Sequence, residues 1–224
     1  MELAATEHFD FPALARLHRH GKLRGSAAIS RTIQAWHMTH FNRPCTILPV
    51  IIDESIWFPD GSQRVNNRIG YLDEGPHTSN TIELLRVASQ ASGLNLEFIE
   101  LRGDEADIRT GMQKCTVFLG MNRGKDPLWG EGCPLSTLES MFAGCVLIAF
   151  DVLGNREIVQ HGFNGFLIPP ECPDLMASTL IRLFKTSGEI GRLQINTLAL
   201  VNCCHRFESR WPAVKEFLNL DDLE

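Results

Sequence analysis

The sequence has no membrane-spanning run and no dense cluster of positive charge. No apolar stretch approaches the roughly 20 residues that a helix needs to cross a bilayer. Residues 1–15 carry acidic side chains where a signal peptide would be basic. The formal net charge of −6 disfavours a general nucleic-acid binder, which needs cations to replace phosphate counterions. We therefore expect a cytoplasmic protein with no nucleic-acid partner and no transmembrane segment, and peripheral attachment to a membrane stays open.

Paired cysteine motifs are also missing. The seven cysteines include no Cys-x-x-Cys pair, and most lie in apolar runs such as the one that begins at Cys145, so we expect reduced core residues. Cys203 and Cys204 precede His205, but adjacent side chains diverge and no second cluster would complete a tetrahedral site. We therefore expect no bound metal.

The sequence does contain a regular alternation of strand and helix patterns. Its hydrophobic content of 44% is ordinary for a globular protein. Short β-branched or apolar runs predict strands at residues 27–30, 46–51, 68–72, 96–101, 116–120, 146–151 and 165–168. Apolar residues three and four apart predict helices at residues 31–41, 81–91, 105–114, 135–143, 156–161 and 174–184. This order predicts an α/β fold with a Rossmann-like, doubly wound parallel sheet.

One polar stretch divides the chain. After Pro59 the sequence is rich in Gly, Ser, Gln and Asn and loses its periodicity, which is typical of a linker. Only two expected strands precede this stretch, too few for an independent Rossmann-type sheet. We therefore expect a remnant or tail of a first domain at residues 1–60, a linker at 61–67, a Rossmann-like domain at 68–205 and a closing C-terminal helix at 206–224.

The segment from Glu131 to Glu139 has the features of a ligand site. It follows an expected strand and a polar loop, and then enters a helix. In an open α/β sheet such a loop lies at the carboxyl edge, where helix N-terminal amides can bind a diphosphate. The two carboxylates could bind separate hydroxyl-bearing parts of one ligand. Alternatively, Ser136 to Glu139 forms a capping box in which Glu139 only accepts the amide of Ser136. The residues alone leave both interpretations open.

Five elements in order make this region resemble the C-terminal domain of the retaining GT-B glycosyltransferases of the glycogen and sucrose synthase-like type. They are the Glu131 and Glu139 pair, Met141-Phe-Ala-Gly144, the hydrophobic strand ending at Asp151, Gly154-Asn-Arg-Glu157 and Asn164-Gly-Phe-Leu-Ile-Pro169. The strong resemblance covers residues 131–170, and a weaker one extends over residues 26–218. It implies the C-terminal half of a GT-B fold with a partial N-terminal segment.

The resemblance also implies roles for individual residues. Glu131 is expected to be the catalytic residue that contacts the transferred sugar, and Glu139 to bind the ribose hydroxyls of the donor. The further implied donor-binding residues, close to the diphosphate, are Gly132, Cys133, Leu135 and Ser136. No metal cofactor is implied. The expected partners are a nucleotide sugar and a saccharide or other hydroxyl acceptor, and a separate N-terminal domain or partner chain is a further option.

The chain departs from the family pattern where two cations normally neutralise the diphosphate. Tyr71 stands in place of the usual Arg, and Pro76 or His77 in place of the usual Lys. Tyr71 can donate a hydrogen bond but carries no charge, and His77 is mostly neutral at pH 7. Arg123 and Lys125, in the loop before the helix, are alternative donor-binding cations or simply solvated residues. Most of the acceptor-binding N-terminal domain is also expected to be absent.

These observations favour a retaining, nucleotide-sugar-dependent glycosyltransferase of carbohydrate biosynthesis, or its donor-binding half, which transfers a hexose. The resemblance implies that the departing diphosphate helps to deprotonate the acceptor, while the protein positions and stabilises the charges. The alternative, suggested by the missing cations, is a noncatalytic binding or assembly module that has lost turnover. A sugar epimerase on the same fold is a third hypothesis.

Overall fold

The strands that alternate with helices form a parallel sheet. The computed structural model describes residues 16, 20, 25–59, 64–122, 132–170 and 172–219. The main sheet has the order β4-β3-β5-β6-β7, and all neighbouring strands in it are parallel. Its strands are β3 (Val65–Tyr71), β4 (Glu97–Glu100), β5 (Cys115–Gly120), β6 (Val146–Phe150) and β7 (Gly165–Ile168). The expected α/β fold is confirmed.

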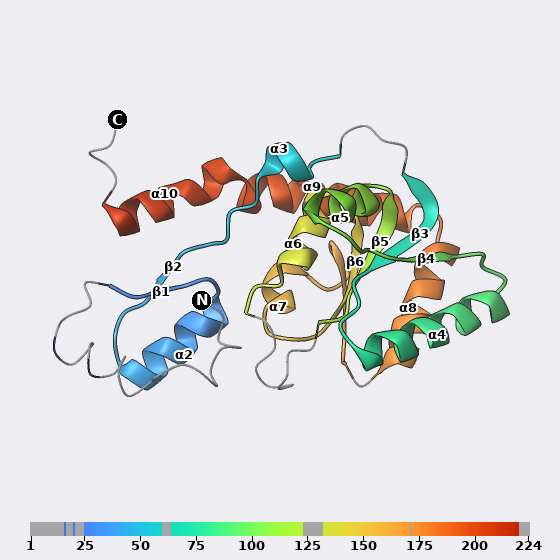
Figure 1. Ribbon diagram of the computed structural model, residues 1–224, viewed down its shortest axis with the longest axis horizontal. Helices are drawn as coiled ribbons and strands as arrows, with labels where there is room; N and C mark the ends of the chain where they lie inside the picture. The colour runs from blue at the N-terminus through green and yellow to red at the C-terminus, as the bar shows by residue number, and fades with distance from the viewer. Residues whose placement is uncertain are drawn as a thin grey trace.

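Helices cover both faces of this sheet (Figure 1). On one face α4 packs against α8, and on the other α5 and α6 cover β5. A short helix, α7, follows β6, and α9 leads into a π-helical turn, η2. Their bounds are α4 (Pro76–Ala91), α5 (Glu105–Gln113), α6 (Leu135–Phe142), α7 (Asn155–Ile158), α8 (Pro173–Lys185), α9 (Glu189–Leu200) and η2 (Val201–His205).

The two central strands supply side chains to both hydrophobic clusters. Every residue of β5 and β6 is buried, which explains why these strands appear in the sequence as continuous apolar runs. Val117 and Leu119 pack in the cluster beneath α4 and α8. Phe118, which points to the opposite face, packs with Leu138 and Phe142 of α6. This packing fixes α6 on one face of the sheet, with its N-terminus toward the carboxyl ends of the strands.

A glycine ends the helix α6. Gly144 has a φ of +76°, and its amide donates to the carbonyl of Met141 at 2.9 Å. A Cβ at Gly144 would also approach a guanidinium nitrogen of Arg64 to 3.1 Å. Both the backbone conformation and the crowding therefore favour glycine at this helix end.

The N-terminal part forms a small separate sheet. Its strands β1 and β2 are parallel, with α2 between them in the chain. Figure 1 shows α10 leaving the main sheet and extending toward this segment. Further along the chain, Arg206, directly before α10, forms an ion pair of 2.7 Å with Glu54 of α3. The bounds are β1 (Ala27–Ala28), α2 (Arg31–Phe41), β2 (Thr46–Ile47), α3 (Glu54–Trp57) and α10 (Phe207–Leu218).

Among the differences from the sequence-based expectations are two shifted boundaries and a helix that was not expected. Residues 65–67, which we had assigned to the linker, belong to β3, and the Asn67 side chain donates to the carbonyl of Asn95 at 2.8 Å. Helix α4 begins at Pro76 rather than at residue 81, because proline is well suited to the first helical turn. Helix α9 was not expected, since Ile195 is 70% exposed and disrupts the apolar pattern.

The cysteines occupy different environments. All seven are free, but only Cys45, Cys115 and Cys145 are buried, whereas Cys203 and Cys204 are exposed. The expectation of core cysteines therefore holds for only part of the set. Within the described parts of the chain, no helix has the length and apolar character needed to span a membrane.

Candidate functional site

The strand order indicates the edge of the sheet at which a ligand crevice is expected. From β3 the chain passes to β4 on one side and then crosses back to β5 on the other. Ligands of open α/β sheets bind outside the carboxyl ends of the strands at such a reversal. Here the edge is formed by the segments that follow Tyr71 and Gly120, between the N-termini of α4 and α6 (Figure 1).

Within the described residues, no side chain caps the N-terminus of α6. Its N-cap is Pro134, which has no side-chain hydrogen-bonding group for the first turn. Ser136 lies inside the helix rather than at the cap, so the capping-box interpretation is wrong for this helix. Leu135 is exposed and Ser136 half-buried. Uncapped amides at a helix N-terminus favour an anion.

Glu139 is one turn inside the same helix. The side chain is half-buried, and burial together with the Glu105 carboxylate raises its pKa to about 7. No described residue donates a hydrogen bond to its carboxylate. A buried carboxylate without a protein donor is costly unless something else supplies hydrogen bonds. The geometry is therefore suited to a ligand hydroxyl, and the ribose-binding role stays a prediction.

The two residues that replace the family cations lie in different surroundings. His77 lies in the first turn of α4, and its Nε2 is 3.1 Å from the carbonyl oxygen of Met121 at the crevice. Because a carbonyl only accepts, Nε2 donates to it, and Nδ1 is the ring nitrogen left to contact a ligand. Tyr71 is 8% exposed in the core beneath α4, and burial raises its pKa. This position is unfavourable for a phosphate contact.

The loop before α6 lies against the N-terminal segment. Gly132 and Cys133 are half-buried. A Cβ at Gly132 would lie 2.3 Å from Cδ1 of Ile33 in α2 and 3.9 Å from Oγ of Ser30. The Ile33 side chain therefore lies directly against Gly132, and a larger residue there would displace it, so α2 lies beside this loop. Glu131, Arg123 and Lys125 lie outside the described residues.

A buried amide links the elements around the crevice, and the sequence analysis missed its role. Asn155 is fully buried, and its side-chain nitrogen donates to Oδ1 of Asn122 at 3.2 Å and to the carbonyl of Phe150 at 2.9 Å. Thr137 of α6 donates to Oδ1 of Asn155 at 3.0 Å. The network joins the ends of β5 and β6 to α6 and α7. Its only signal in the sequence is the Gly-Asn-x-Glu turn.

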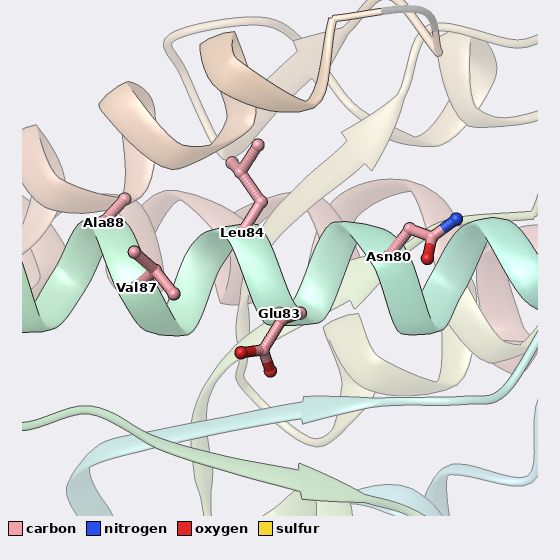
Figure 2. Close-up of a pocket in the computed structure, with 5 residues that line it drawn as sticks. All are labelled: Asn80, Glu83, Leu84, Val87 and Ala88. Carbon is pink, nitrogen blue, oxygen red and sulfur yellow. The ribbon is translucent and has the colours of Figure 1, made fainter.

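A pocket elsewhere has a different character. It lies on α4 and is lined by Asn80, Glu83, Leu84, Val87 and Ala88. Figure 2 shows the Leu84 and Glu83 side chains pointing to opposite sides of the helix. This lining contains no cation and no helix N-terminus, so it is a poor site for a diphosphate. Among the described ranges, no three His, Cys, Asp or Glu side chains come together as metal ligands.

Comparisons with known proteins bear on the same region. The family described as glycosyl transferases group 1 matches residues 74–186. An exopolysaccharide phosphotransferase of Streptomyces coelicolor is 29% identical over 117 residues, which are 52% of this chain and 11% of that protein. A phosphatidyl-myo-inositol mannosyltransferase of Mycobacterium tuberculosis is 31% identical over 77 residues, which are 34% of this chain and 19% of that protein. The chain thus spans less than a fifth of the length of these curated relatives.

Solved structures share the fold over nearly the whole chain. A mutant of S. aureus TarM, in complex with Fondaparinux, alpha-GlcNAc-glycerol and UDP, matches with a TM-score of 0.68 and 13% identity and covers 95% of this chain and 46% of its own. Anabaena HepE in complex with UDP-glucose matches with a TM-score of 0.67 and 15% identity, and the match covers 97% of this chain and 70% of HepE. At these identities the likeness establishes the fold alone.

Proposed function

Since this chain belongs to the glycosyl transferases group 1 family, we propose that it carries the donor-binding half of a GT-B glycosyltransferase. The observation that supports this most directly is Glu139, a half-buried carboxylate without a described protein donor, beside the uncapped N-terminus of α6. A nucleotide sugar offers both ribose hydroxyls for the carboxylate and a diphosphate for the amides.

The proposed mechanism assigns each group to one part of the donor. The diphosphate lies against the amides near Leu135 and Ser136 and against the loop at Gly132 and Cys133, where the helix dipole favours negative charge. Glu139 accepts hydrogen bonds from the ribose. This contact requires the ionised carboxylate, which is formed as the pH rises through its pKa of about 7. Stabilising the departing diphosphate is the main electrostatic contribution to transfer.

The remaining roles follow from the family resemblance. We assign Glu131 to the transferred hexose, and Arg123 and Lys125 to the charge of the diphosphate. His77 would reach the donor only through Nδ1, and the buried Tyr71 is a weaker candidate. Transfer to a saccharide or other hydroxyl acceptor, with retention of configuration and without a metal, completes the proposal. UDP is the first nucleotide to test because the S. aureus TarM and Anabaena HepE complexes contain UDP or UDP-glucose.

Calorimetric titration of the 224-residue chain with UDP, GDP and ADP tests this function. We expect one nucleotide to bind in a saturable manner. Glu139→Ala removes a charged acceptor of two hydroxyl hydrogen bonds. The variant should therefore bind that nucleotide less tightly by about 3 kcal/mol, or roughly a hundred-fold in Kd. Glu83→Ala, on the exposed face of α4, is the matched control and should leave Kd unchanged.

Two outcomes would contradict the proposal. One is that none of the three nucleotides binds, and the other is that Glu139→Ala behaves like Glu83→Ala. Binding without any hydrolysis or transfer of the corresponding nucleotide sugar would instead support the noncatalytic binding module, which the missing family cations suggested.

A further inference from the structure

Glu157, the last residue of the Gly154-Asn-Arg-Glu157 motif, contacts a distant part of the chain. Its carboxylate accepts hydrogen bonds from the amide of Arg31 at 2.9 Å and from the amide of Thr32 at 3.0 Å. The Thr32 hydroxyl donates to the same carboxylate at 3.3 Å. The contact therefore joins α7 of the sheet domain to the first turn of α2 in the N-terminal segment.

This contact completes the N-terminal cap of α2. The hydroxyl of Ser30 accepts from the amide of Ile33 at 3.3 Å, so a local side chain satisfies one first-turn donor. Glu157 satisfies the two before it, and a negative charge is favourable at this end of a helix dipole. One half of the cap is local, and the other half depends on the sheet domain lying in its present position.

The sheet-domain side of the contact is anchored to the donor helix. Asn155, two residues before Glu157, is fully buried and bonded to Thr137 of α6 and Asn122 after β5. Glu157 therefore projects from a turn whose position is set by the same elements that form the crevice. A carboxylate on this turn can place α2 relative to α6.

A second contact between the same elements supports this arrangement. Cδ1 of Ile33 would lie 2.3 Å from a Cβ at Gly132, so the first turn of α2 also rests on the loop that leads into α6. The polar and apolar contacts come from two different parts of the sheet domain, and both meet the same helical turn.

We infer that Glu157 is a positioning residue that holds α2 as the second wall of the donor crevice. This inference rests on the proposed function for the identity of the ligand. Arg31 and Glu157 are both exposed, so water can replace their contact and the wall can separate to admit or release the donor. When the contact forms, α2 lies over Gly132 and α6. Transfer requires both walls because donor and acceptor must be held in register.

Hydrogen exchange on the full chain tests the inference. In the nucleotide-free chain, Glu157→Ala should speed exchange of the amides at residues 31–33 by about tenfold, because two of them lose their acceptor. Glu157→Gln, which keeps one acceptor oxygen, should fall between the wild type and Glu157→Ala. Glu83→Gln, at an exposed site on α4, is the matched control and should leave these amides unchanged.

Kinetics separate positioning from general destabilisation. With UDP-glucose as the probe, Glu157→Ala should lower turnover by about tenfold while the Kd for UDP stays within about threefold. Unchanged exchange at residues 31–33 would overturn the inference, and so would equal losses of UDP affinity and turnover. Failure of every variant and the wild type to bind UDP would count against the proposed donor site, whereas the nucleotide-free exchange would still decide the role of Glu157.

Discussion

Half-buried charged side chains at the two ends of the sheet domain differ in their hydrogen-bond partners. At the crevice, Glu139 is half-buried and no described residue donates to it. At the joint between α9 and α10, Arg210 is also half-buried, but Nε donates to the carbonyl of Cys204 at 3.1 Å. Its other guanidinium nitrogens bond to the carbonyl of Val50 and to Nδ1 of His205.

Burial shifts the pKa values at both ends against the charged forms. It raises the pKa of Glu139 to about 7, and with the neighbouring Arg210 it lowers the pKa of His205 to about 4. The joint compensates for its buried cation with protein acceptors, which connect α10, η2 and the segment before α3. At the crevice, no described residue supplies a hydrogen bond to Glu139. The difference fits a structural role for the polar groups of the joint and the proposed ligand-binding role for Glu139.

Removing Arg210 should have the largest effect on stability. Arg210→Met fills a similar volume but leaves three acceptors without their donor, so we expect a loss of about 3 kcal/mol in the free energy of unfolding, measured with urea. Arg192→Met is the control. The Arg192 side chain is exposed, although it bonds to Glu189 and to the carbonyl of Gly162, so Arg192→Met should cost less than about 1 kcal/mol. Equal losses for the two variants would remove the structural role that we assign to the joint.

The pH dependence of stability should show the next largest effect, at His205. Its folded pKa of about 4 lies below the unfolded value of 6.5, so the unfolded chain takes up a proton first. Stability is therefore full above pH 6.5 and falls as the pH drops toward 4. His205→Asn keeps an acceptor for Arg210 but does not titrate, and should reduce this fall by about 2 kcal/mol. Parallel curves for the two proteins would contradict the shift.

The sheet was predictable because its signals are local. The residues of β5 and β6 are buried on both faces and form continuous apolar runs. Gly144 marks the end of α6 through its positive φ. In contrast, the Asn-rich start of β3 resembled a linker, since its polar side chains are satisfied by backbone groups distant in sequence, as Asn67 is by Asn95.

The site was predictable only in part. Its place at a helix N-terminus after β5 follows from the strand order, and the family resemblance singled out Glu139. The burial of Tyr71 and the contact between Glu157 and α2 could not be read from the sequence. The contact between Thr32 and Glu157 joins residues 125 positions apart, and no local sequence pattern predicts a contact over such a distance in the chain. The proposed donor-binding roles of the crevice residues stay predictions.

The smallest expected change in stability, that of Glu139→Gln, tests most directly whether the crevice differs from the joint at Arg210. The folded pKa of Glu139, about 7, lies above the unfolded value of 4.5, so its ionisation opposes folding increasingly from pH 4.5 to 7 and fully above that. Glu139→Gln should therefore stabilise the chain by about 1 kcal/mol at pH 8, after allowance for partial solvent exposure, and should have no effect at pH 4. Glu83→Gln should change stability at neither pH.

A gain in the stability of Glu139→Gln together with weaker nucleotide binding would mean that the carboxylate is retained for its ligand at the expense of the fold. A loss of stability at pH 8 would instead mean that Glu139 has a structural partner and that the crevice resembles the joint.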